Sequence, residues 1–232
     1  MMSSRKTRTD VVKPAGRVAT GKLTNKHSKD SGGRERQHLA LVGFMGSGKS
    51  AVGRALAHRL KISFVDLDEV IVEQAGMSIP EIFKQSGEVA FRARERQALR
   101  LVLQREEPTI IATGGGTFID ETMRTTLADH AVTLYLETDV ATLMSRLSTE
   151  GEVAARPMLK GPEPAKTIER LLEKRGPIYQ RADQRVTTTA RGVDDVVTEI
   201  IRSLKLEQPQ RGSRTERVEV SASTGSKGVR EI

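Results

Sequence analysis

The fold of this chain is decided by one stretch, GFMGSGKS, at residues Gly43–Ser50. It matches the pattern G-x-x-x-x-G-K-[ST], and it stands between an apolar run, His38–Val42, and a helical pattern, Gly48–Leu60, which is the context this motif needs. Glycines let successive backbone N–H groups turn toward phosphate oxygens, and the helix N-terminus adds positive potential. Lys49 supplies a positive charge for the β- and γ-phosphates, and the Ser50 hydroxyl is a ligand for Mg²⁺. The stretch therefore predicts a P-loop that binds ATP together with Mg²⁺.

Strand and helix patterns alternate along residues 37–206. The expected strands are His38–Val42, Ile62–Val65, Thr109–Thr113, Ala131–Glu137 and Arg185–Thr189. The expected helices are Gly48–Leu60, Glu69–Gln74, a short helix opened by the capping-box pair Ser78 and Glu81, Glu88–Arg105, Glu121–Leu127, Asp139–Arg146, Pro164–Lys174 and Val193–Leu206, with a loop at residues 148–163. Strands that alternate with helices predict a parallel sheet covered on both faces, and five strands are enough for one three-layer α/β/α domain.

The charge of the chain is concentrated at its ends. The length of 232 residues suits one domain with tails, and the formal net charge is +8. Residues 1–36 hold 10 Lys and Arg against 3 Asp and Glu, residues 207–232 hold 5 against 4, and residues 37–206 are balanced. Both ends lack apolar periodicity, so we expect a disordered basic tail at 1–36, a P-loop domain at 37–206 and a disordered tail at 207–232. The basic arm also suits contact with nucleic acid or an anionic surface, or an organelle transit peptide, although it lacks a clear amphipathic helix.

Several functional classes are excluded by what the sequence lacks. The chain has no cysteine, which rules out a disulfide framework and a thiolate metal site. No apolar run approaches the roughly 20 residues of a membrane helix, and the N-terminus has no apolar segment of a secretory signal. The guanine-binding pattern N-K-x-D does not follow the P-loop, since TNKH at residues 24–27 lies upstream and lacks the Asp. A compact domain with a P-loop near its start suggests a small-molecule kinase, which we expect to be cytoplasmic, monomeric and not bound to a membrane. Contact of the basic arm with nucleic acid stays an alternative to this expectation.

Two carboxylates follow the second expected strand, in FVDLDE at residues 64–69. Asp66 and Asp68 alternate with Leu67, so in an extended strand both side chains point to one side at its C-terminal end. Ligands bind at that edge of an open parallel sheet. One carboxylate can then support Mg²⁺, while the other binds an acceptor hydroxyl and takes its proton. The alternative is structural: the two carboxylates end the strand and cap the next helix.

Arginines and glycines form a second set of candidates for acceptor binding. Arg92 and Glu95 are three residues apart on one helical face, and Arg92 can hold a carboxylate in bidentate fashion. The stretch TGGGT at residues 113–117 follows the third strand and offers bare backbone N–H groups. Arg156, before a proline in an aperiodic segment, can swing over the phosphates, and Arg175 at a helix end is another anion clamp. Taken singly, these features also fit a surface ion pair, a flexible turn, a surface arginine and a helix C-terminus.

Together, the motifs resemble those of the shikimate kinase family, in order and at family-like spacing over residues 37–206. The matching motifs are GFMGSGKS at Gly43–Ser50, DLD at Asp66–Asp68, FRARE at Phe91–Glu95, GGG at Gly114–Gly116, RP at Arg156–Pro157 and RGPIY at Arg175–Tyr179. The resemblance implies a nucleoside-monophosphate-kinase-like α/β/α fold with a five-stranded parallel sheet. It also implies phosphorylation of shikimate by ATP to shikimate 3-phosphate in aromatic amino-acid biosynthesis. It gives no role to residues 1–36 and 207–232.

The same resemblance implies a role for the residues of each motif. The implied catalytic residues are Lys49, Asp68 and Arg156, the last as an arginine of a lid. The implied ATP-binding residues are Gly46, Ser47, Gly48, Lys49, Ser50, Ala51, Arg146 and Arg156, with Arg146 against the adenine. The implied shikimate-binding residues are Asp68, Arg92, Gly114, Gly115, Gly116 and Arg175. The implied metal-binding residues are Ser50 and, through water, Asp66.

Two other functions are compatible with parts of the sequence. A gluconate or nucleotide kinase of the same fold would have the same P-loop, although Arg92, Arg175 and Gly114–Gly116 favour a small carboxylated polyol as acceptor. A catalytically inactive protein that binds nucleic acid through its basic tail is the second alternative. Four intact residues argue against lost catalysis: Lys49, Ser50, Asp66 and Asp68.

Overall fold

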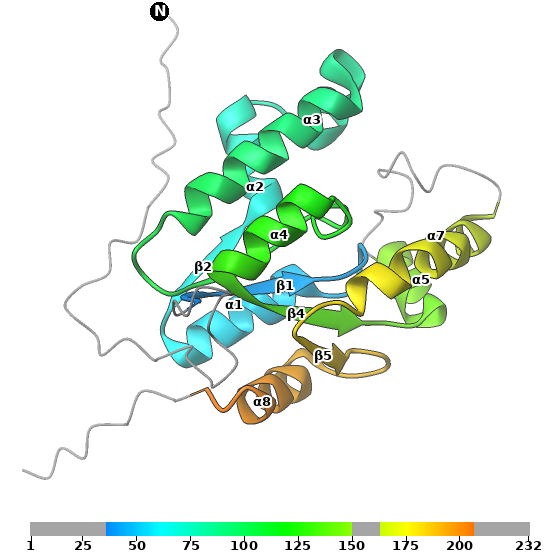
Figure 1. Ribbon diagram of the computed structural model, residues 1–232. Helices are drawn as coiled ribbons and strands as arrows, with labels where there is room; N and C mark the ends of the chain where they lie inside the picture. The colour runs from blue at the N-terminus through cyan, green and yellow to red at the C-terminus, as the bar shows by residue number, and fades with distance from the viewer. Residues whose placement is uncertain (1–35, 150–162, 207–232) are drawn as a thin grey trace, which may run out of the picture.

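The sheet at the centre of the molecule has five parallel strands (Figure 1). A computed structural model of the chain describes residues 36–149 and 163–206. The strands are β1 His38–Val42, β2 Ser63–Asp66, β3 Thr109–Ala112, β4 Ala131–Glu137 and β5 Gln184–Thr187, in the spatial order β2-β3-β1-β4-β5. Each pair of neighbouring strands is parallel, which confirms the fold predicted from the sequence.

Strand β1 lies in the middle of the sheet, with every residue buried. Leu39 is paired with Ile110 of β3 on one side and with Val132 of β4 on the other. Apolar residues occupy successive positions without alternation because helices cover both faces of the sheet. The two neighbouring strands therefore fix β1, and with it the position of the P-loop that follows.

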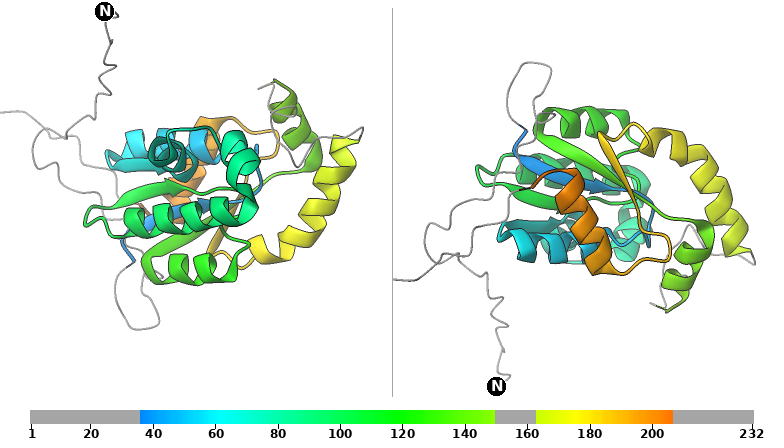
Figure 2. Two further views of the ribbon diagram at one scale, coloured as in Figure 1. Left: turned by 90° about the horizontal axis from the view of Figure 1, so that it is seen from above. Right: turned by 90° about the horizontal axis from the view of Figure 1, so that it is seen from below.

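Helices form a layer on each face of the sheet (Figures 1 and 2). One face is covered by α1 Lys49–Leu60 and α8 Val193–Ser203, and the other by α3 Ile79–Leu103 and α4 Glu121–His130, with α2 Leu67–Ala75 packed on α3. The remaining helices, α5 Val140–Thr149 and α7 Pro164–Tyr179, pack together beyond the ends of the strands. Each layer has its own apolar core, with Leu56 and Ile200 in the first and Leu99 and Leu127 in the second. None of the helices in these two ranges of residues has the length and apolarity of a membrane span.

Two helices differ clearly from the sequence-based expectation. Helix α3 joins two helical segments across a kink at Gly87, so the short and the long helix expected there are adjacent parts of one element. Helix α7 runs through Pro177 to Tyr179, past its expected end at Lys174. A proline so close to a helix end removes only one hydrogen bond, and the buried Tyr179 ring holds the last turn against the core.

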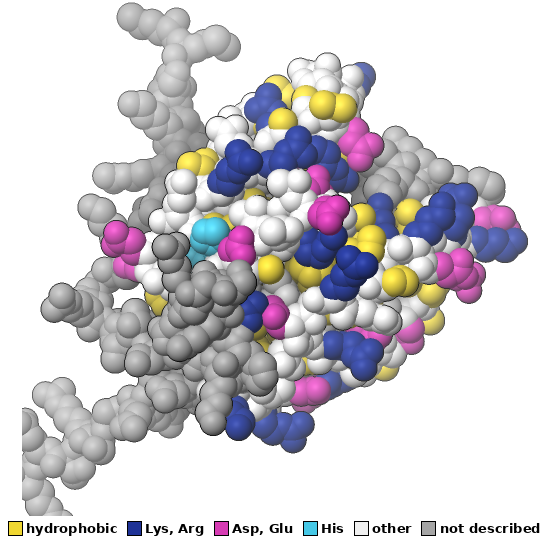
Figure 3. Space-filling model, in the orientation of Figure 1, with side chains coloured by type: hydrophobic (Ala, Val, Ile, Leu, Met, Phe, Trp, Pro, Cys, Tyr) yellow, Lys and Arg dark blue, Asp and Glu magenta, His cyan; other side chains and the backbone are white. Residues whose placement is uncertain are grey.

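The surface carries both signs of charge. Figure 3 shows Lys and Arg side chains over the face formed by α3, α4 and α7, with Asp and Glu side chains among them. Two exposed ion pairs join Arg54 to Glu69 and Lys166 to Glu163. This mixture agrees with the balanced charge of residues 37–206.

Arg36 belongs to the folded domain and not to the tail expected at residues 1–36. Its buried side chain donates to Asp183, with both carboxylate oxygens 2.9 Å from Nη1. Asp183 also accepts hydrogen bonds from the backbone N–H and the hydroxyl of Thr133, at 2.8 and 2.7 Å. This contact between residues far apart in the chain could not be predicted from apolar periodicity. The rest of the two expected tails, residues 1–35 and 207–232, lies outside the described residues.

Asp183→Asn should destabilise the protein by about 3 kcal/mol, because the buried Arg36 guanidinium loses its counter-charge. The measurement is the free energy of unfolding in urea. Glu69→Gln is the control, since the ion pair of Arg54 and Glu69 is exposed on both sides and should contribute less than about 1 kcal/mol. Equal losses of stability in the two variants would contradict the anchoring role of Asp183.

Acid should weaken the fold through His38, the first residue of β1. Burial lowers the pKa of His38, a backbone hydrogen bond with Leu103 opposes this, and the charges of His130 and Arg105 lower it further. The folded state thus favours the neutral ring, so stability present above the ordinary pKa of 6.5 is lost as the pH falls and the unfolded chain takes up the proton. Between about pH 7.5 and 5.5, the free energy of unfolding should fall less steeply in His38→Asn than in the wild type. A variant of the exposed His58, His58→Asn, should keep the wild-type slope; an unchanged slope in His38→Asn would show that His38 is not the sensitive group.

Candidate active site

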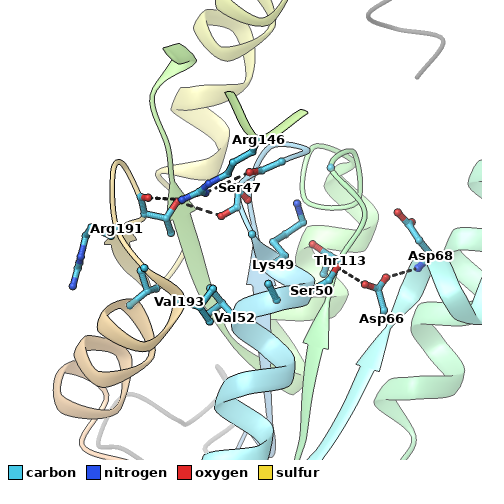
Figure 4. Close-up of a pocket in the computed structure, with 17 residues that line it drawn as sticks. Ser47, Lys49, Ser50, Val52, Asp66, Asp68, Thr113, Arg146, Arg191 and Val193 are labelled. Atoms are coloured by element: carbon cyan, nitrogen blue, oxygen red, sulfur yellow. Dashed lines mark hydrogen bonds between the residues drawn. The ribbon is translucent and has the colours of Figure 1, made fainter. Parts of the chain in front are cut away.

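A cavity of about 580 Å³ lies between the P-loop and the loop that follows β5 (Figure 4). Its lining residues are Gly46, Ser47, Gly48, Lys49, Ser50, Ala51, Val52, Asp66, Asp68, Thr113, Gly115, Arg146, Thr188, Arg191, Gly192, Val193 and Val196. They come from the P-loop and the start of α1, the turn from β2 to α2, the loop after β3, α5, and the turn from β5 to α8. The cavity therefore lies at the edge where the parallel strands end, as is usual for ligand sites in such sheets.

The P-loop brings positive charge to this cavity. Gly48, the N-cap of α1, has a φ of 91°, which an L side chain rarely adopts, so a glycine is needed there. Lys49, the first residue of α1, is buried and donates through Nζ to the carbonyl oxygens of Gly43 and Phe44, at 3.0 and 2.8 Å. The ammonium group is thereby held against the loop, at the N-terminal end of α1. The positive charge of Lys49 and the positive end of the α1 dipole therefore lie together, which suits the binding of a phosphate group.

Ser50 and Asp66 are joined by a hydrogen bond in which Ser50 Oγ donates to Asp66 Oδ2 at 2.5 Å. Asp66 is also the N-cap of α2, since its Oδ1 accepts from the backbone N–H of Asp68 at 3.0 Å. Strand β2 therefore ends at Asp66, and Asp68 lies in the first turn of a helix. The prediction that the two carboxylates alternate on an extended strand is wrong, because the N-cap bond turns the chain into α2 at this point. Both carboxylates nevertheless line the cavity.

The pair of Ser50 and Asp66 fits a magnesium ion. Mg²⁺ prefers oxygen ligands, keeps several waters, and is usually held by one or two carboxylates together with substrate phosphates. Ser50 supplies a hydroxyl and Asp66 a carboxylate, side by side in the cavity. Residues 36–149 and 163–206 contain no group of three or more His, Cys, Asp or Glu that could hold a metal without such help. The two residues would thus hold the ion together with a nucleotide.

A buried ion pair fixes Arg92. Glu95, fully buried in α3, accepts from Arg92 Nη1 and from the hydroxyl of Thr117, each at 2.6 Å. Glu88 adds a longer contact with Arg92, at 3.4 Å. Burial alone would lower the pKa of Arg92, but Glu95 and Glu88 outweigh this and raise it. The predicted interaction between Arg92 and Glu95 is thus confirmed, and the guanidinium keeps a partly exposed surface for another anion.

Gly114 and Gly116 make room for this ion pair. A Cβ at Gly114 would lie 2.6 Å from Glu95 Oε1 and 3.2 Å from Asp68 Oδ1. A Cβ at Gly116 would lie 2.6 Å from Arg92 Nη1. At contacts under 3 Å an added Cβ would push these side chains away, so the two glycines let the charged groups approach the backbone. From the sequence, we expected these glycines to let a ligand approach the backbone N–H groups. Their contact with Arg92 and Glu95 was not predicted.

Arg175 approaches the same region from α7. Its guanidinium carbon lies 5.8 Å from the centre of the Phe44 ring in the P-loop. Burial raises the pKa of the Tyr179 phenol to about 12, and Arg175 and Arg92 act on the same phenol in the opposite direction. The two arginines are therefore close to one buried group. Neither of them lines the cavity.

The predicted site residues thus fall into two groups. Those that line the cavity are Gly46, Ser47, Gly48, Lys49, Ser50, Ala51, Asp66, Asp68, Gly115 and Arg146. Those that lie beyond its lining are Arg92, Gly114, Gly116 and Arg175. Asp68 connects the groups, since it lines the cavity and also lies beside Gly114. Arg156 lies outside the described residues.

Sequence reasoning missed the loop after β5, which closes the cavity opposite the P-loop. Arg146 of α5 donates to the Thr188 carbonyl at 2.7 Å, to the Thr188 hydroxyl at 3.1 Å and to the Gly46 carbonyl at 3.4 Å. The Thr188 hydroxyl in turn donates to the Ser47 carbonyl at 3.2 Å. Thr188, Arg191 and Val193 match no motif, and the only available signal was the rule that loops after parallel strands share one edge.

Proteins of one family are similar to this chain in sequence and structure. The family model described as shikimate kinase matches residues 45–205. The shikimate kinase of Nitrobacter winogradskyi is 43% identical over 155 residues, which are 67% of this chain and 70% of that protein. The shikimate kinase of Thermus thermophilus is 38% identical over 181 residues, which are 78% of this chain and 96% of that protein. The solved structure of shikimate kinase from Acinetobacter baumannii in complex with shikimate has a TM-score of 0.68 and 33% identity, and the match covers 73% of this chain and 93% of that one.

The region matched by the family model contains the candidate site. The family model spans well over half of the chain and includes the P-loop lysine, the two carboxylates of β2 and α2, and the arginines of α3 and α7. The matched regions cover most of the length of each relative, so the similarity extends over a whole domain and is not limited to one motif. This chain belongs to the shikimate kinase family.

Proposed function

We propose that this protein transfers the γ-phosphoryl group of ATP to a hydroxyl group of shikimate, giving ADP and shikimate 3-phosphate for aromatic amino-acid biosynthesis. The observation that carries the proposal is the position of Asp68, which lines the cavity with Lys49 and Ser50 and also lies beside Gly114. One carboxylate thus stands between a phosphate site and a region with arginines for an anionic acceptor. The family membership supports the choice of acceptor, as does the shikimate in the Acinetobacter relative.

ATP would bind in the cavity with its phosphates on the P-loop. The backbone of residues 46–51 and the N-terminus of α1 would hold the β- and γ-phosphates, and Lys49 would neutralise charge that develops on the transferring group. Ser50 would bind Mg²⁺ directly and Asp66 through water; the ion, when bound, neutralises phosphate charge. Arg146 would lie against the adenine, since it lines the cavity beside the loop after β5.

Shikimate would bind beside Asp68. The Asp68 carboxylate would accept a hydrogen bond from the reacting hydroxyl and take its proton as the oxygen bonds to the γ-phosphorus and the bond to the β–γ bridging oxygen breaks. Arg92, Arg175 and the backbone of Gly114–Gly116 would bind the carboxylate of shikimate. Because Glu95 already holds Arg92 in place, little side-chain entropy would be lost when the acceptor binds.

The proposal also includes a lid arginine, a location in the cell and an oligomeric state. Arg156 would act as the lid arginine that closes over the phosphates, but it lies outside the described residues. A cytoplasmic location and a monomeric state also belong to the proposal.

The reaction is tested by giving the purified protein ATP, Mg²⁺ and one acceptor at a time, and by measuring the release of ADP. The acceptors are shikimate, gluconate and a nucleoside monophosphate. We expect turnover with shikimate, and its loss when Mg²⁺ is chelated. Turnover of gluconate or a nucleotide without turnover of shikimate would reject the proposal. Salt-dependent nucleic-acid binding with no turnover of any acceptor would favour a non-enzymatic role.

Lys49→Ala should lower kcat about 100- to 1,000-fold, because a positive group aimed at the transferring phosphoryl is lost in a site shielded from water. Steady-state kinetics with ATP and shikimate measure the effect, and circular dichroism checks that the fold is retained. The matched control is Lys84→Ala, an exposed lysine of α3, which should keep the wild-type kcat. Near-normal turnover by Lys49→Ala would place the phosphates elsewhere.

Arg92→Ala should raise KM for shikimate roughly tenfold to a hundredfold and leave KM for ATP almost unchanged, because a charge-assisted hydrogen bond to an anion contributes about 1.5–3 kcal/mol. Arg92→Lys keeps the charge but not the bidentate geometry, so it should recover only part of the loss. Arg100→Ala, a change of an exposed arginine two turns further along α3, is the control and should leave both constants unchanged. A rise in KM for ATP with KM for shikimate unchanged would show that the two halves of the site are assigned the wrong way round.

A further inference from the structure

Tyr179, at the end of α7, contacts the loop that follows β3. Its side chain is fully buried, and its hydroxyl donates to the carbonyl oxygen of Gly115 at 2.5 Å. Gly114 and Gly116, on either side of that carbonyl, are the residues that lie against Glu95 and Arg92. The phenol oxygen is therefore a direct link between α7 and the loop proposed to bind the acceptor.

The ring of Tyr179 is held rigidly. It stacks on Tyr135 of β4 with ring centres 5.2 Å apart and an angle of 16° between the planes. Tyr135 is itself buried, and both rings belong to the apolar core that also contains Phe44 of the P-loop. A ring fixed on one face by another ring and buried all round delivers its hydroxyl to one position.

The loop that receives this hydrogen bond has little freedom of its own. A Cβ at Gly115 would lie 3.4 Å from the backbone nitrogen of Met45, so the loop packs directly on the P-loop. On its other side, the hydroxyl of Thr117 donates to Glu95. Gly116 lies directly against Arg92, since an added Cβ would be 2.6 Å from Nη1, so a shift of the loop toward Arg92 would displace the guanidinium.

Tyr179 also lies close to both arginines that would bind the carboxylate of shikimate. Burial raises the pKa of Tyr179 to about 12, while Arg175 and Arg92 act on the phenol in the opposite direction. At neutral pH the phenol is thus protonated and remains a hydrogen-bond donor. Arg175 precedes Tyr179 by four residues, so the two side chains lie on one face of α7.

We propose that Tyr179 is a positioning residue for shikimate: its hydroxyl sets the loop Gly114–Gly116 and the α7 turn that carries Arg175 at the separation the acceptor needs. The inference rests on the proposed function, which it deepens. Tyr179 does not line the cavity for ATP, and its hydroxyl is already engaged with Gly115. It acts through the residues that touch the acceptor, so it affects acceptor binding more than ATP binding.

Tyr179→Phe removes this hydroxyl and keeps the ring. The buried Gly115 carbonyl then loses its donor, so KM for shikimate should rise about fivefold to thirtyfold, while KM for ATP should change by less than about twofold. The chain has two tyrosines, which makes Tyr135→Phe a matched control. It removes a hydroxyl from the other ring of the stack and should leave KM for shikimate within about twofold of the wild type.

A third variant separates positioning from stability. Ile200→Val removes one methylene from a fully buried side chain in the other apolar core, so it should lower Tm without changing KM for shikimate. If Tyr179→Phe lowers Tm but leaves KM for shikimate unchanged, the inference is overturned. It is equally overturned if both KM values rise together, or if Tyr135→Phe raises KM for shikimate as much as Tyr179→Phe does.

The tyrosine spectrum gives an independent readout, because the chain contains no tryptophan. In Tyr135→Phe, the tyrosine bands of the near-ultraviolet circular dichroism come from Tyr179 alone. Saturating shikimate should change these bands, since its carboxylate would partly neutralise Arg92 and Arg175 beside the phenol; unchanged bands contradict the inference.

The kinetics of the wild type distinguish failure of the proposed function from failure of the role proposed for Tyr179. No shikimate turnover by the wild type rejects the proposed function, whereas wild-type turnover with an unchanged KM in Tyr179→Phe rejects only the role of Tyr179.

Discussion

The hydrogen bond from Ser50 to Asp66 joins the start of α1, the helix that follows β1, to the end of β2, a strand that is not a neighbour of β1 in the sheet. Ser50 follows β1 and Asp66 ends β2, and β3 lies between these strands. The same carboxylate caps α2, so one side chain decides where β2 stops, where α2 starts and how the P-loop serine is oriented. Asp66 therefore links the connection from β1 to α1 with the connection from β2 to α2, at the edge of the sheet where ligands bind. The position of Asp68, which lies between the proposed phosphate site and the proposed acceptor site, depends on this cap by Asp66.

The two halves of the site are built in different ways. The proposed phosphate half is a continuous stretch, Gly43–Ser50, whose backbone and helix N-terminus would provide most of the binding groups. The proposed acceptor half is assembled from side chains of α3 and α7 around a loop that follows β3. Local backbone geometry specifies the first half. The second exists only when helices from separate parts of the chain are packed correctly, so it is sensitive to small displacements of α3 or α7.

This difference explains how much could be predicted from the sequence. The central strand, the P-loop and the parallel sheet have local signatures, and the structure bears them out. The strand pattern failed at Asp66, because an alternation of period two cannot distinguish the last strand residue from a helix N-cap. Arg36 was placed in a tail because its partner, Asp183, is distant in the chain. The acceptor residues were assigned through resemblance, since Arg92 alone is also consistent with an ordinary surface ion pair.

The pair of Arg92 and Glu95 is a costly arrangement for stability alone. Burying a carboxylate completely requires a desolvation free energy that an ion pair often fails to recover, and apolar residues of similar size frequently serve stability as well or better. A side chain at Gly114 or Gly116 would also displace the pair, so glycines stand at both positions. What the arrangement provides is an arginine held in one orientation with part of its surface left for a second anion. Glu95 and Glu88 offset the charge of Arg92, so selectivity in the proposed site would come from geometry: a guanidinium forms a bidentate pair of charge-assisted hydrogen bonds with a carboxylate, and a neutral hydroxyl cannot reproduce that pair.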